Sequence, residues 1–293
     1  LMAIKVGVIG LGQMGGAIAN NLIQNRFDVC GYDVKVKARS ELSKYGGAAL
    51  ASVSSVAAKA DILILSLPGP DALNDVTHEI ANSGQKVLVA MEISTLTLED
   101  KQAAHDRLKD ADIVLLDIPM SGTGVQAKSG DLVYFASGDK TAFTAAKPVL
   151  EGFCRDGFYL GDFGNGSRIK FVANLLVAVH NVAAAEALTL ARKAGLDTKQ
   201  TLEVLGASAA TSRMLEVRGP SMLSGEYDSG GIALRLFQKD LKIIDIFAKE
   251  LGVSAPLFKV STKIYGRAIE EGHADDDTAS VCAVLERMSD ITR

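Results

Sequence analysis

Apolar and polar positions alternate regularly along the first half of the chain. Short runs of valine, isoleucine and leucine recur, and segments with apolar residues every three or four positions lie between them. Apolar strands that alternate with amphipathic helices are typical of a parallel sheet covered on both faces. The pattern predicts strands at 4–10, 28–33, 61–68, 86–94 and 112–119, helices at 13–25, 70–82 and 97–109, and strands at 132–138 and 157–164 that extend the alternation.

The pattern changes after Gly164, where strand-like runs stop. A helix of about 28 residues is predicted from near Ser167 to Gly195. We therefore predict an α/β domain over 1–163 and an all-α domain over 164–293, joined by the long helix. Further helices are predicted at about 198–207, 211–223, 233–251, 255–272 and 277–289.

Composition narrows the classes of protein. The 293 residues are 48% apolar and carry a formal net charge of −4, so a full core is expected and a general affinity for nucleic acid or an anionic membrane is not. The three cysteines show no CxxC spacing, which indicates reduced thiols and a cytoplasmic protein. The first residues read as a strand rather than a signal peptide. We also expect no apolar run near the ~20 residues that cross a bilayer.

The clearest candidate site is the glycine-rich turn VGVIGLGQMGG. Its glycines match G-x-G-x-x-G between a predicted strand and a predicted helix. In that setting the glycines permit a tight turn, a close approach to a pyrophosphate and close packing of the helix on the strand. The helix N-terminus then offers N–H groups to the anion. The predicted cofactor-binding residues here are Gly10, Leu11, Gly12, Gln13, Met14 and Gly15.

Asp33 ends the next predicted strand, 18 residues after Gly15. A carboxylate at this place accepts hydrogen bonds from the adenine-ribose hydroxyls and repels a 2′-phosphate, so it favours NAD over NADP. Lys35, Lys37 and Arg39 follow closely, and each could receive a 2′-phosphate. NAD is therefore the predicted cofactor, with NADP left open.

Several separated stretches resemble the β-hydroxyacid dehydrogenase family, which includes 3-hydroxyisobutyrate dehydrogenase and tartronate semialdehyde reductase. The resemblance covers nearly the whole chain. It implies an α/β Rossmann-type dinucleotide-binding domain over 1–163 and an all-α substrate and oligomerisation domain over 164–293. It also implies an NAD(P)-dependent oxidoreductase that interconverts a small β-hydroxy acid and its semialdehyde or keto form between the two domains. A reductase of the same plan acting on a threonate-like sugar acid or an imine is the alternative. The stretches are GLGQMG (10–15), DIPMSGTG (117–124), GNGSRIKFVAN (164–174) and KDLKIIDIFAKELGV (239–253).

The third stretch fits the family pattern G-x-G-x-x-x-K-x-x-x-N, with Lys170 and Asn174 about one helical turn apart on one face. The resemblance implies that Lys170 is the general acid/base and that Asn174 helps to hold the substrate. An ammonium beside a carbonyl that gains a hydride stabilises the charge on oxygen and then donates its proton. The alternative is a lysine on the helix surface that reaches water.

The resemblance also implies a substrate-binding loop and a second lysine. Ser121 and Gly122 would hold the substrate carboxylate. Thr123 stands where the family usually has a second glycine, so we expect a substrate other than 3-hydroxyisobutyrate. Lys239, followed by Asp240, would reach the nicotinamide side of the cofactor or the substrate; the alternative is a surface ion pair.

Residues at other predicted strand ends complete the expected site. Leu67, Pro68 and Thr95 are implied to line the path of the cofactor, and an acid precedes the Ser-Thr pair at Glu92. His180 is interpreted as a core or interface residue. The histidines lack metal-ligand spacing, so no metal is expected. Because the long helix is apolar on more than one face, we expect a homodimer or homotetramer.

Overall fold

The computed structural model describes residues 4–84, 88–228 and 231–292. It divides into two compact units, Leu1–Lys170 and Phe171–Arg293. The helix α8 (Asn165–Lys193) contributes residues to both. Part of the strand expected at 86–94 lies outside the described residues.

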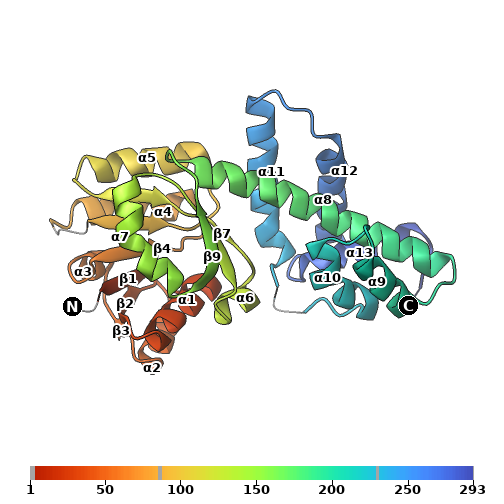
Figure 1. Cartoon of the computed structure of the whole chain (residues 1–293), viewed down its shortest axis with the longest axis horizontal. Coiled ribbons are helices and arrows are strands. Elements are labelled where there is room, and N and C mark those ends of the chain that lie inside the picture. Colours follow the sequence, from red (N-terminus) through yellow and green to blue (C-terminus); the bar gives the residue numbers. More distant parts are fainter. Residues whose placement is uncertain (1–3, 85–87, 229–230, 293) are drawn as a thin grey trace. The chain divides into compact units, whose positions relative to one another are not determined.

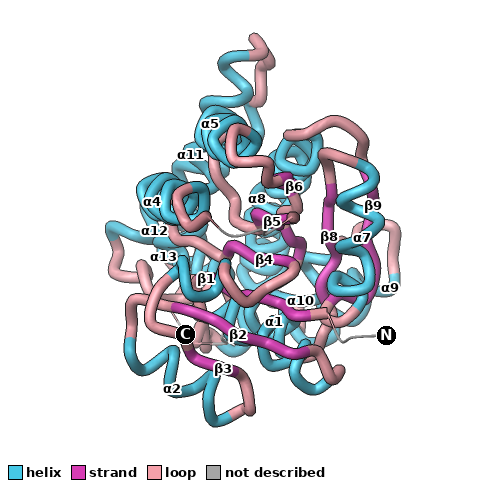
Figure 2. The backbone as a smooth tube through the Cα atoms, turned by 90° about the vertical axis from the view of Figure 1, so that its left-hand side faces the viewer, coloured by secondary structure: helices cyan, strands magenta, loops and turns pink. Residues whose placement is uncertain are grey.

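A parallel six-stranded sheet forms the centre of the first unit (Figure 2). The strand order is β3-β2-β1-β4-β5-β6, so the chain leaves β1 toward one edge and returns to the other side of β1 with β4. Ligands of such sheets bind at the carboxyl ends of the strands, at the point where the order reverses. The strands are β1 (Lys5–Ile9), β2 (Asp28–Tyr32), β3 (Ala48–Ala49), β4 (Ile62–Leu65), β5 (Val89–Glu92) and β6 (Val114–Asp117).

Successive strand residues point to opposite sides of this sheet, and apolar side chains occur on both sides. Helices therefore cover both faces. On one face, Val6 and Val8 pack with Ile18 and Leu22 of α1. On the other face, Leu63 packs in a cluster formed with α3, α4 and α5. Each side chain of this size buried on folding contributes about 2 kcal/mol. The helices are α1 (Gln13–Gln24), α2 (Val36–Lys44), α3 (Val53–Ala57), α4 (Pro70–Ala81) and α5 (Leu98–Lys109).

The strands expected at 132–138 and 157–164 do not extend the parallel sheet. They belong to a separate three-stranded sheet with order β7-β8-β9, in which β7 is antiparallel to β8 and β9 is parallel to it. An isolated bridge between Asp117 and Ser137 links the end of β6 to the end of β8. The elements are β7 (Met120–Ser121), α6 (Gly124–Lys128), β8 (Leu132–Ala136), α7 (Lys140–Glu151) and β9 (Cys154–Tyr159).

Helix α8 corrects one expectation about the chain. Among the described residues it is the one helix long and apolar enough to cross a membrane by length and composition, with a mean hydropathy of 1.6 over its most apolar window. Of that window, 44% is buried within the protein. The expectation that no run reaches this length was wrong, because small apolar residues continue on several faces of α8.

The second unit is helical in its described secondary structure, apart from one bridge between Ala233 and Asp277. The amide of Asn181 on α8 donates to the Tyr265 hydroxyl at 2.9 Å and to the Thr278 carbonyl at 2.8 Å. The helical elements of this unit confirm the predicted all-α second half (Figure 1). Its elements are α9 (Thr198–Ala207), α10 (Arg213–Ser224), α11 (Leu234–Glu250), α12 (Pro256–Glu270), a 3₁₀ helix (Thr278–Ser280) and α13 (Val281–Met288).

Candidate active site

The glycine-rich turn lies between β1 and α1. Gly10 has φ +88°, and a Cβ there would lie 2.1 Å from the Ser66 carbonyl oxygen. A Cβ on Gly15 would lie 1.9 Å from the Gly10 carbonyl oxygen, so α1 needs a glycine to pack this closely. At Gly12 the added Cβ would meet no atom within 4 Å. The chain thus leaves the side facing Gly12 open at the start of α1, as a pyrophosphate cradle requires.

Asp33 is fixed beside this turn by two backbone donors. Its carboxylate accepts hydrogen bonds from the Leu11 N–H and the Lys35 N–H, each at 2.8 Å. Arg39 donates to the Asp33 backbone carbonyl at 2.5 Å and lies over the Tyr32 ring at 5.5 Å. The guanidinium is therefore engaged with the end of β2, and the Asp33 carboxylate is the acidic group presented beside the glycine loop.

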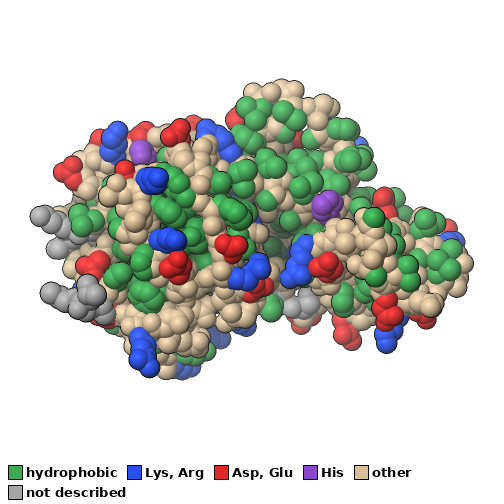
Figure 3. All heavy atoms as spheres, in the orientation of Figure 1, with side chains coloured by type: hydrophobic (Ala, Val, Ile, Leu, Met, Phe, Trp, Pro, Cys, Tyr) green, Lys and Arg blue, Asp and Glu red, His purple; other side chains and the backbone are tan. Residues whose placement is uncertain are grey.

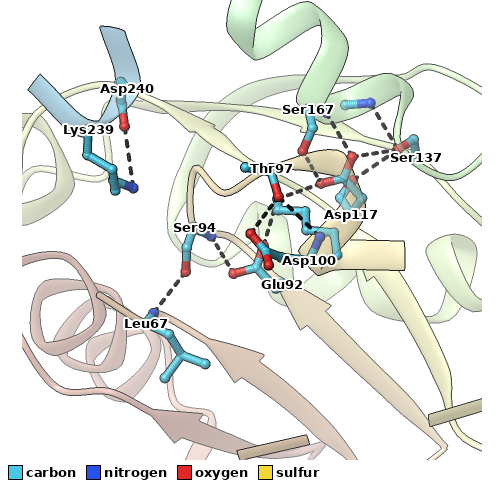
Figure 4. A network of polar contacts seen from close by, with 12 residues as sticks. Leu67, Glu92, Ser94, Thr97, Asp100, Asp117, Ser137, Ser167, Lys239 and Asp240 are labelled. Atoms are coloured by element: carbon cyan, nitrogen blue, oxygen red, sulfur yellow. Dashed lines mark hydrogen bonds and ion pairs between the residues drawn. The ribbon is translucent and has the colours of Figure 1, made fainter. Parts of the chain in front are cut away.

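Two loops that follow β4 and β5 are joined by a short chain of hydrogen bonds. The Leu67 N–H donates to the Ser94 hydroxyl at 2.8 Å. The Ser94 N–H donates to Glu92 Oε1, also at 2.8 Å. Figure 4 shows this chain running from the loop after β4 to the end of β5. Leu67, Pro68 and Thr95, expected to line the cofactor path, belong to these loops.

A fully buried cluster of three charges lies at the ends of β5 and β6, and Figure 4 labels its two carboxylates, Glu92 and Asp117. Lys101 Nζ lies 2.6 Å from Glu92 Oε2 and 2.7 Å from Asp117 Oδ1; only the second contact also has the geometry of a directed hydrogen bond. Burial alone lowers the pKa of Lys101, but the Asp117 and Glu92 carboxylates together outweigh burial and raise it above the ordinary value. The Lys101 side chain is therefore an ammonium at neutral pH.

The same Asp117 fastens the start of α8. Its Oδ2 accepts the Ser167 N–H at 2.8 Å, and its Oδ1 accepts the Ser167 hydroxyl at 2.8 Å. The preceding N–H, of Gly166, donates to the Ser137 hydroxyl at 2.9 Å. These partners satisfy N–H groups that the first turn of a helix otherwise leaves unpaired, and a carboxylate at that end is stabilised by the helix dipole.

Two different requirements explain the glycines of the G-x-G-x-x-x-K stretch. Gly164 has φ +88°, a conformation that favours glycine, whereas Gly166 lies too close to other backbone for a side chain. A Cβ on Gly166 would lie 2.2 Å from the Phe135 carbonyl oxygen and 2.8 Å from that of Asp117. The first turn of α8 thus lies directly against the backbones of β6 and β8, and Lys170 follows in the next turn.

Lys170 and Asn174 are both buried, with 8% and 6% of their surface exposed, on one face of α8. The Asn174 amide donates to Asp240 Oδ2 at 3.0 Å, and Lys239 Nζ lies 3.4 Å from Asp240 Oδ1. Asp240 on α11 therefore orients the Asn174 amide and pairs with Lys239. The burial of Lys170 does not fit a lysine that extends to water, which was the alternative to a chemical role.

The loop with Ser121, Gly122 and Thr123 packs against α1. A Cβ on Gly124 would lie 2.4 Å from the Gln13 side-chain nitrogen, so this loop lies directly on the glycine-rich turn. The Thr123 N–H donates to Gln126 Oε1 at 3.0 Å, which fixes the start of α6. Gly122 has φ +140°, a conformation that favours glycine.

Sequence reasoning missed some of these residues. Lys101, Ser137 and Ser167 were not singled out, although Lys101 occupies the same buried stripe of α5 as Ala104 and Leu108. A lysine at an apolar position was the available signal. His180, expected in the core or at an interface, is exposed on α8 and so does not lie in the core; its place at an interface stays a prediction.

Comparison with known proteins agrees with this geometry. Residues 5–161 match the family described as the NAD binding domain of 6-phosphogluconate dehydrogenase. Residues 164–285 match the family described as NAD-binding of NADP-dependent 3-hydroxyisobutyrate dehydrogenase.

Full-length relatives are similar over nearly the whole chain. An L-threonate dehydrogenase of Pectobacterium atrosepticum is 30% identical over 97% of this chain and 95% of its own. A 2-(hydroxymethyl)glutarate dehydrogenase of Eubacterium barkeri is 30% identical over 99% of this chain and 97% of its own. The crystal structure of a 3-hydroxyisobutyrate dehydrogenase from Salmonella typhimurium is also 30% identical, with a TM-score of 0.85, and covers 96% of this chain and 99% of its own.

The glycine loop with its fixed aspartate, the lysine on the anchored helix and these matches lead to one conclusion. The chain belongs to the β-hydroxyacid dehydrogenase family of NAD(P)-dependent oxidoreductases.

Proposed function

We propose that this protein interconverts a small β-hydroxy acid and its semialdehyde or keto form, with Lys170 as the general acid/base. The observation that carries the proposal is the buried Lys170 in the second turn of α8. The first turn of that helix is fastened to Asp117 at the carboxyl end of β6, in the unit that also bears the glycine-rich turn. Carboxyl ends of parallel strands are where such sheets hold their ligands.

Proton transfer is the step we assign to Lys170. In oxidation, its neutral amine accepts the hydroxyl proton while the carbinol C–H bond breaks and the C–O bond becomes a carbonyl. A bound nicotinamide supplies the acceptor for that hydride, and in reduction its donor. In reduction, the Lys170 ammonium stabilises the negative charge that develops on the carbonyl oxygen and then donates the proton.

NAD is the cofactor that the acidic group beside the glycine loop supports. The Asp33 carboxylate is held by two backbone N–H groups, and it would repel a 2′-phosphate. Arg39, one of the three cations that follow, is engaged with the Asp33 carbonyl. The residues proposed to hold the cofactor are Gly10, Leu11, Gly12, Gln13, Met14, Gly15, Asp33, Leu67, Pro68, Thr95 and Lys239.

Substrate binding is assigned to the loop against α1 and to the Asn174 face of α8. Ser121, Gly122 and Thr123 offer hydroxyl and backbone groups to a carboxylate, and Lys239 offers a positive charge. Thr123 adds a methyl group and a hydroxyl, so the substrate differs from 3-hydroxyisobutyrate. A threonate-like sugar acid is the second candidate, because an L-threonate dehydrogenase is among the relatives similar over the whole length.

Assembly into a homodimer or homotetramer completes the proposal. Exposed apolar side chains follow one another on α8, with Val172 54% exposed and Leu176 48% exposed. Figure 3 shows apolar side chains gathered over this part of the molecule. A second copy would cover them. We further assign 1–163 to cofactor binding and 164–293 to substrate binding and assembly, in a cytoplasmic protein.

Replacing Lys170 tests the proposed function. Lys170→Ala is expected to lower kcat for the best of a panel of C3–C5 hydroxy acids by about 1000-fold, because general acid/base catalysis contributes about 10²–10⁴. NADH affinity, followed by fluorescence, should stay within about threefold. Lys199→Ala, an exposed lysine on α9, is the matched control. Turnover of Lys170→Ala within about tenfold of the parent would refute the role.

A further inference from the structure

The buried Lys101 has no part in the proton transfer described above, although it is held by two carboxylates. Lys101, Glu92 and Asp117 are all 0% exposed. Taking three charges out of water is expensive, and a cluster of this kind is often no more stabilising than well-packed apolar side chains. Fold stability by itself is therefore a weak reason for this cluster. The hydrogen bonds that attach Glu92 and Asp117 to neighbouring segments point to another role.

One attachment leads to the loops after β4 and β5. Glu92 directs Oε2 to Lys101 and accepts the Ser94 N–H on Oε1 at 2.8 Å. The Ser94 hydroxyl in turn accepts the Leu67 N–H at 2.8 Å. Through this chain, the position of Glu92 sets the positions of two loops to which we assign the cofactor.

The other attachment leads to the first turn of α8. Asp117 contacts Lys101 and the Ser167 hydroxyl through Oδ1, and it accepts the Ser167 N–H on Oδ2 at 2.8 Å. Lys170 follows Ser167 by three residues, about one helical turn. The direction in which α8 leaves the sheet, and hence the position of Lys170, depends on Asp117.

The charges in the cluster explain why a cation stands between the two carboxylates. One ammonium and two carboxylates leave a single net negative charge beneath the first turn of α8, where the helix dipole is positive. Without the ammonium, Glu92 and Asp117, on neighbouring strands in register, would repel each other in a fully buried site. Repulsion would move the two attachments apart.

We propose that Lys101 is a positioning residue that fixes the cofactor-side loops and the Lys170-bearing start of α8 relative to each other. This role rests on the proposed function, because the proposed function assigns proton transfer to Lys170 and the cofactor to the two loops. Two contacts, one from β5 and one from β6, converge on a single nitrogen atom that α5 carries. Removing the charge at this nitrogen is therefore expected to displace both the loops after β4 and β5 and the first turn of α8.

Hydrogen exchange on Lys101→Met tests the proposal without substrate or cofactor. Methionine has a similar length and no charge, so the pocket stays filled. Amides 93–95 and 166–170 are expected to exchange about tenfold faster than in the parent, while those of β1 keep their rates. Exchange that rises equally throughout the first unit would mean that Lys101 only stabilises the fold, and unchanged exchange at 166–170 would overturn the proposal directly.

A charge-compensated variant separates the two attachments and guards against misfolding of the single variant. Lys101→Met with Glu92→Gln again leaves one net negative charge, on Asp117. Protection of 166–170 is expected to recover, whereas 93–95 stay exchange-labile and NADH binds about tenfold more weakly than to the parent. Loss of protection at both places in the double variant would contradict the separate attachments.

Kinetics then connect positioning to chemistry. In Lys101→Met, kcat is expected to fall about 100-fold, because a shift of about 1 Å in a catalytic group has that effect. Lys101→Arg, which keeps the charge, should recover most of it. A parent without turnover on any panel substrate would refute the proposed function but leave the exchange result intact. Parent-like kcat in Lys101→Met would refute the positioning role.

Discussion

Replacing Gly166 by alanine tests whether the contact between α8 and the sheet is too close for any side chain, as the structure indicates. The new methyl group would lie 2.2 Å from the Phe135 carbonyl oxygen and 2.8 Å from the Asp117 carbonyl oxygen. An ordinary carbon–oxygen contact is about 3.3 Å, so the helix start would have to move by about 1 Å. Both obstructing atoms belong to backbone, which cannot rotate away.

The expected loss of stability follows from the bonds that this movement breaks. The Gly166 N–H bond to Ser137 contributes about 1 kcal/mol, and the Ser167 N–H bond to the Asp117 carboxylate about 2 kcal/mol. Strain from overpacking adds about 1 kcal/mol or more. We therefore expect Gly166→Ala to lower the free energy of unfolding by about 4 kcal/mol. The displacement of Lys170 should lower kcat by about 100-fold.

Urea unfolding followed by circular dichroism, together with kcat, checks both numbers. Gly266→Ala on α12 is the matched control, because its Cβ would meet no atom within 4 Å. The same chemical change should there raise stability by about 0.5 kcal/mol, since it reduces the freedom of the unfolded chain. If both variants were equally stable and Gly166→Ala kept parent kcat, the argument for a sterically fixed helix start would fail.

Two further predictions concern other side chains. Asp33→Asn removes the charge but keeps the shape, so the NAD-over-NADP ratio of kcat/KM should fall by about tenfold, and an unchanged ratio would mean that Asp33 does not meet the ribose. Burial raises the pKa of Cys154 to about 12, so at pH 8 only about one thiol in ten thousand is ionised, against about a quarter for an ordinary cysteine. Iodoacetamide at pH 8, followed by mass spectrometry, should leave native Cys154 almost unlabelled while urea-unfolded protein is labelled, and rapid native labelling would contradict that burial.

Regular periodicity made much of the fold predictable. Strands β4 and β6 were found because each is a short run of large apolar residues, and β1 and β2 because their central residues are buried and they flank the glycine-rich turn and its helix. Helix α2 was given no bounds from the sequence, because Leu42 is its one buried side chain and its apolar stripe is weak. Helix α7 contains Pro148, which is unusual inside a helix and interrupts the pattern.

The site was predictable where a backbone requirement or a motif marks it, and less so where partners are distant in sequence. Gly10 and Gly166 are glycines for reasons of space that their motifs already imply. Asp117 and Ser167 are 50 residues apart, and no local pattern announces that they meet. The same holds for Asn174 and Asp240, which belong to different helices and are 66 residues apart.

The fastening of α8 to β6 has a consequence for dissecting the molecule. A fragment that stopped short of Gly166 would strip Asp117 of both Ser167 contacts and Ser137 of its Gly166 contact. Polar atoms that are now paired would then be exposed to solvent at the carboxyl end of β6. A minimal fragment of the first unit should accordingly end after the second turn of α8, so that Gly166 and Ser167 keep their hydrogen bonds to Ser137 and Asp117.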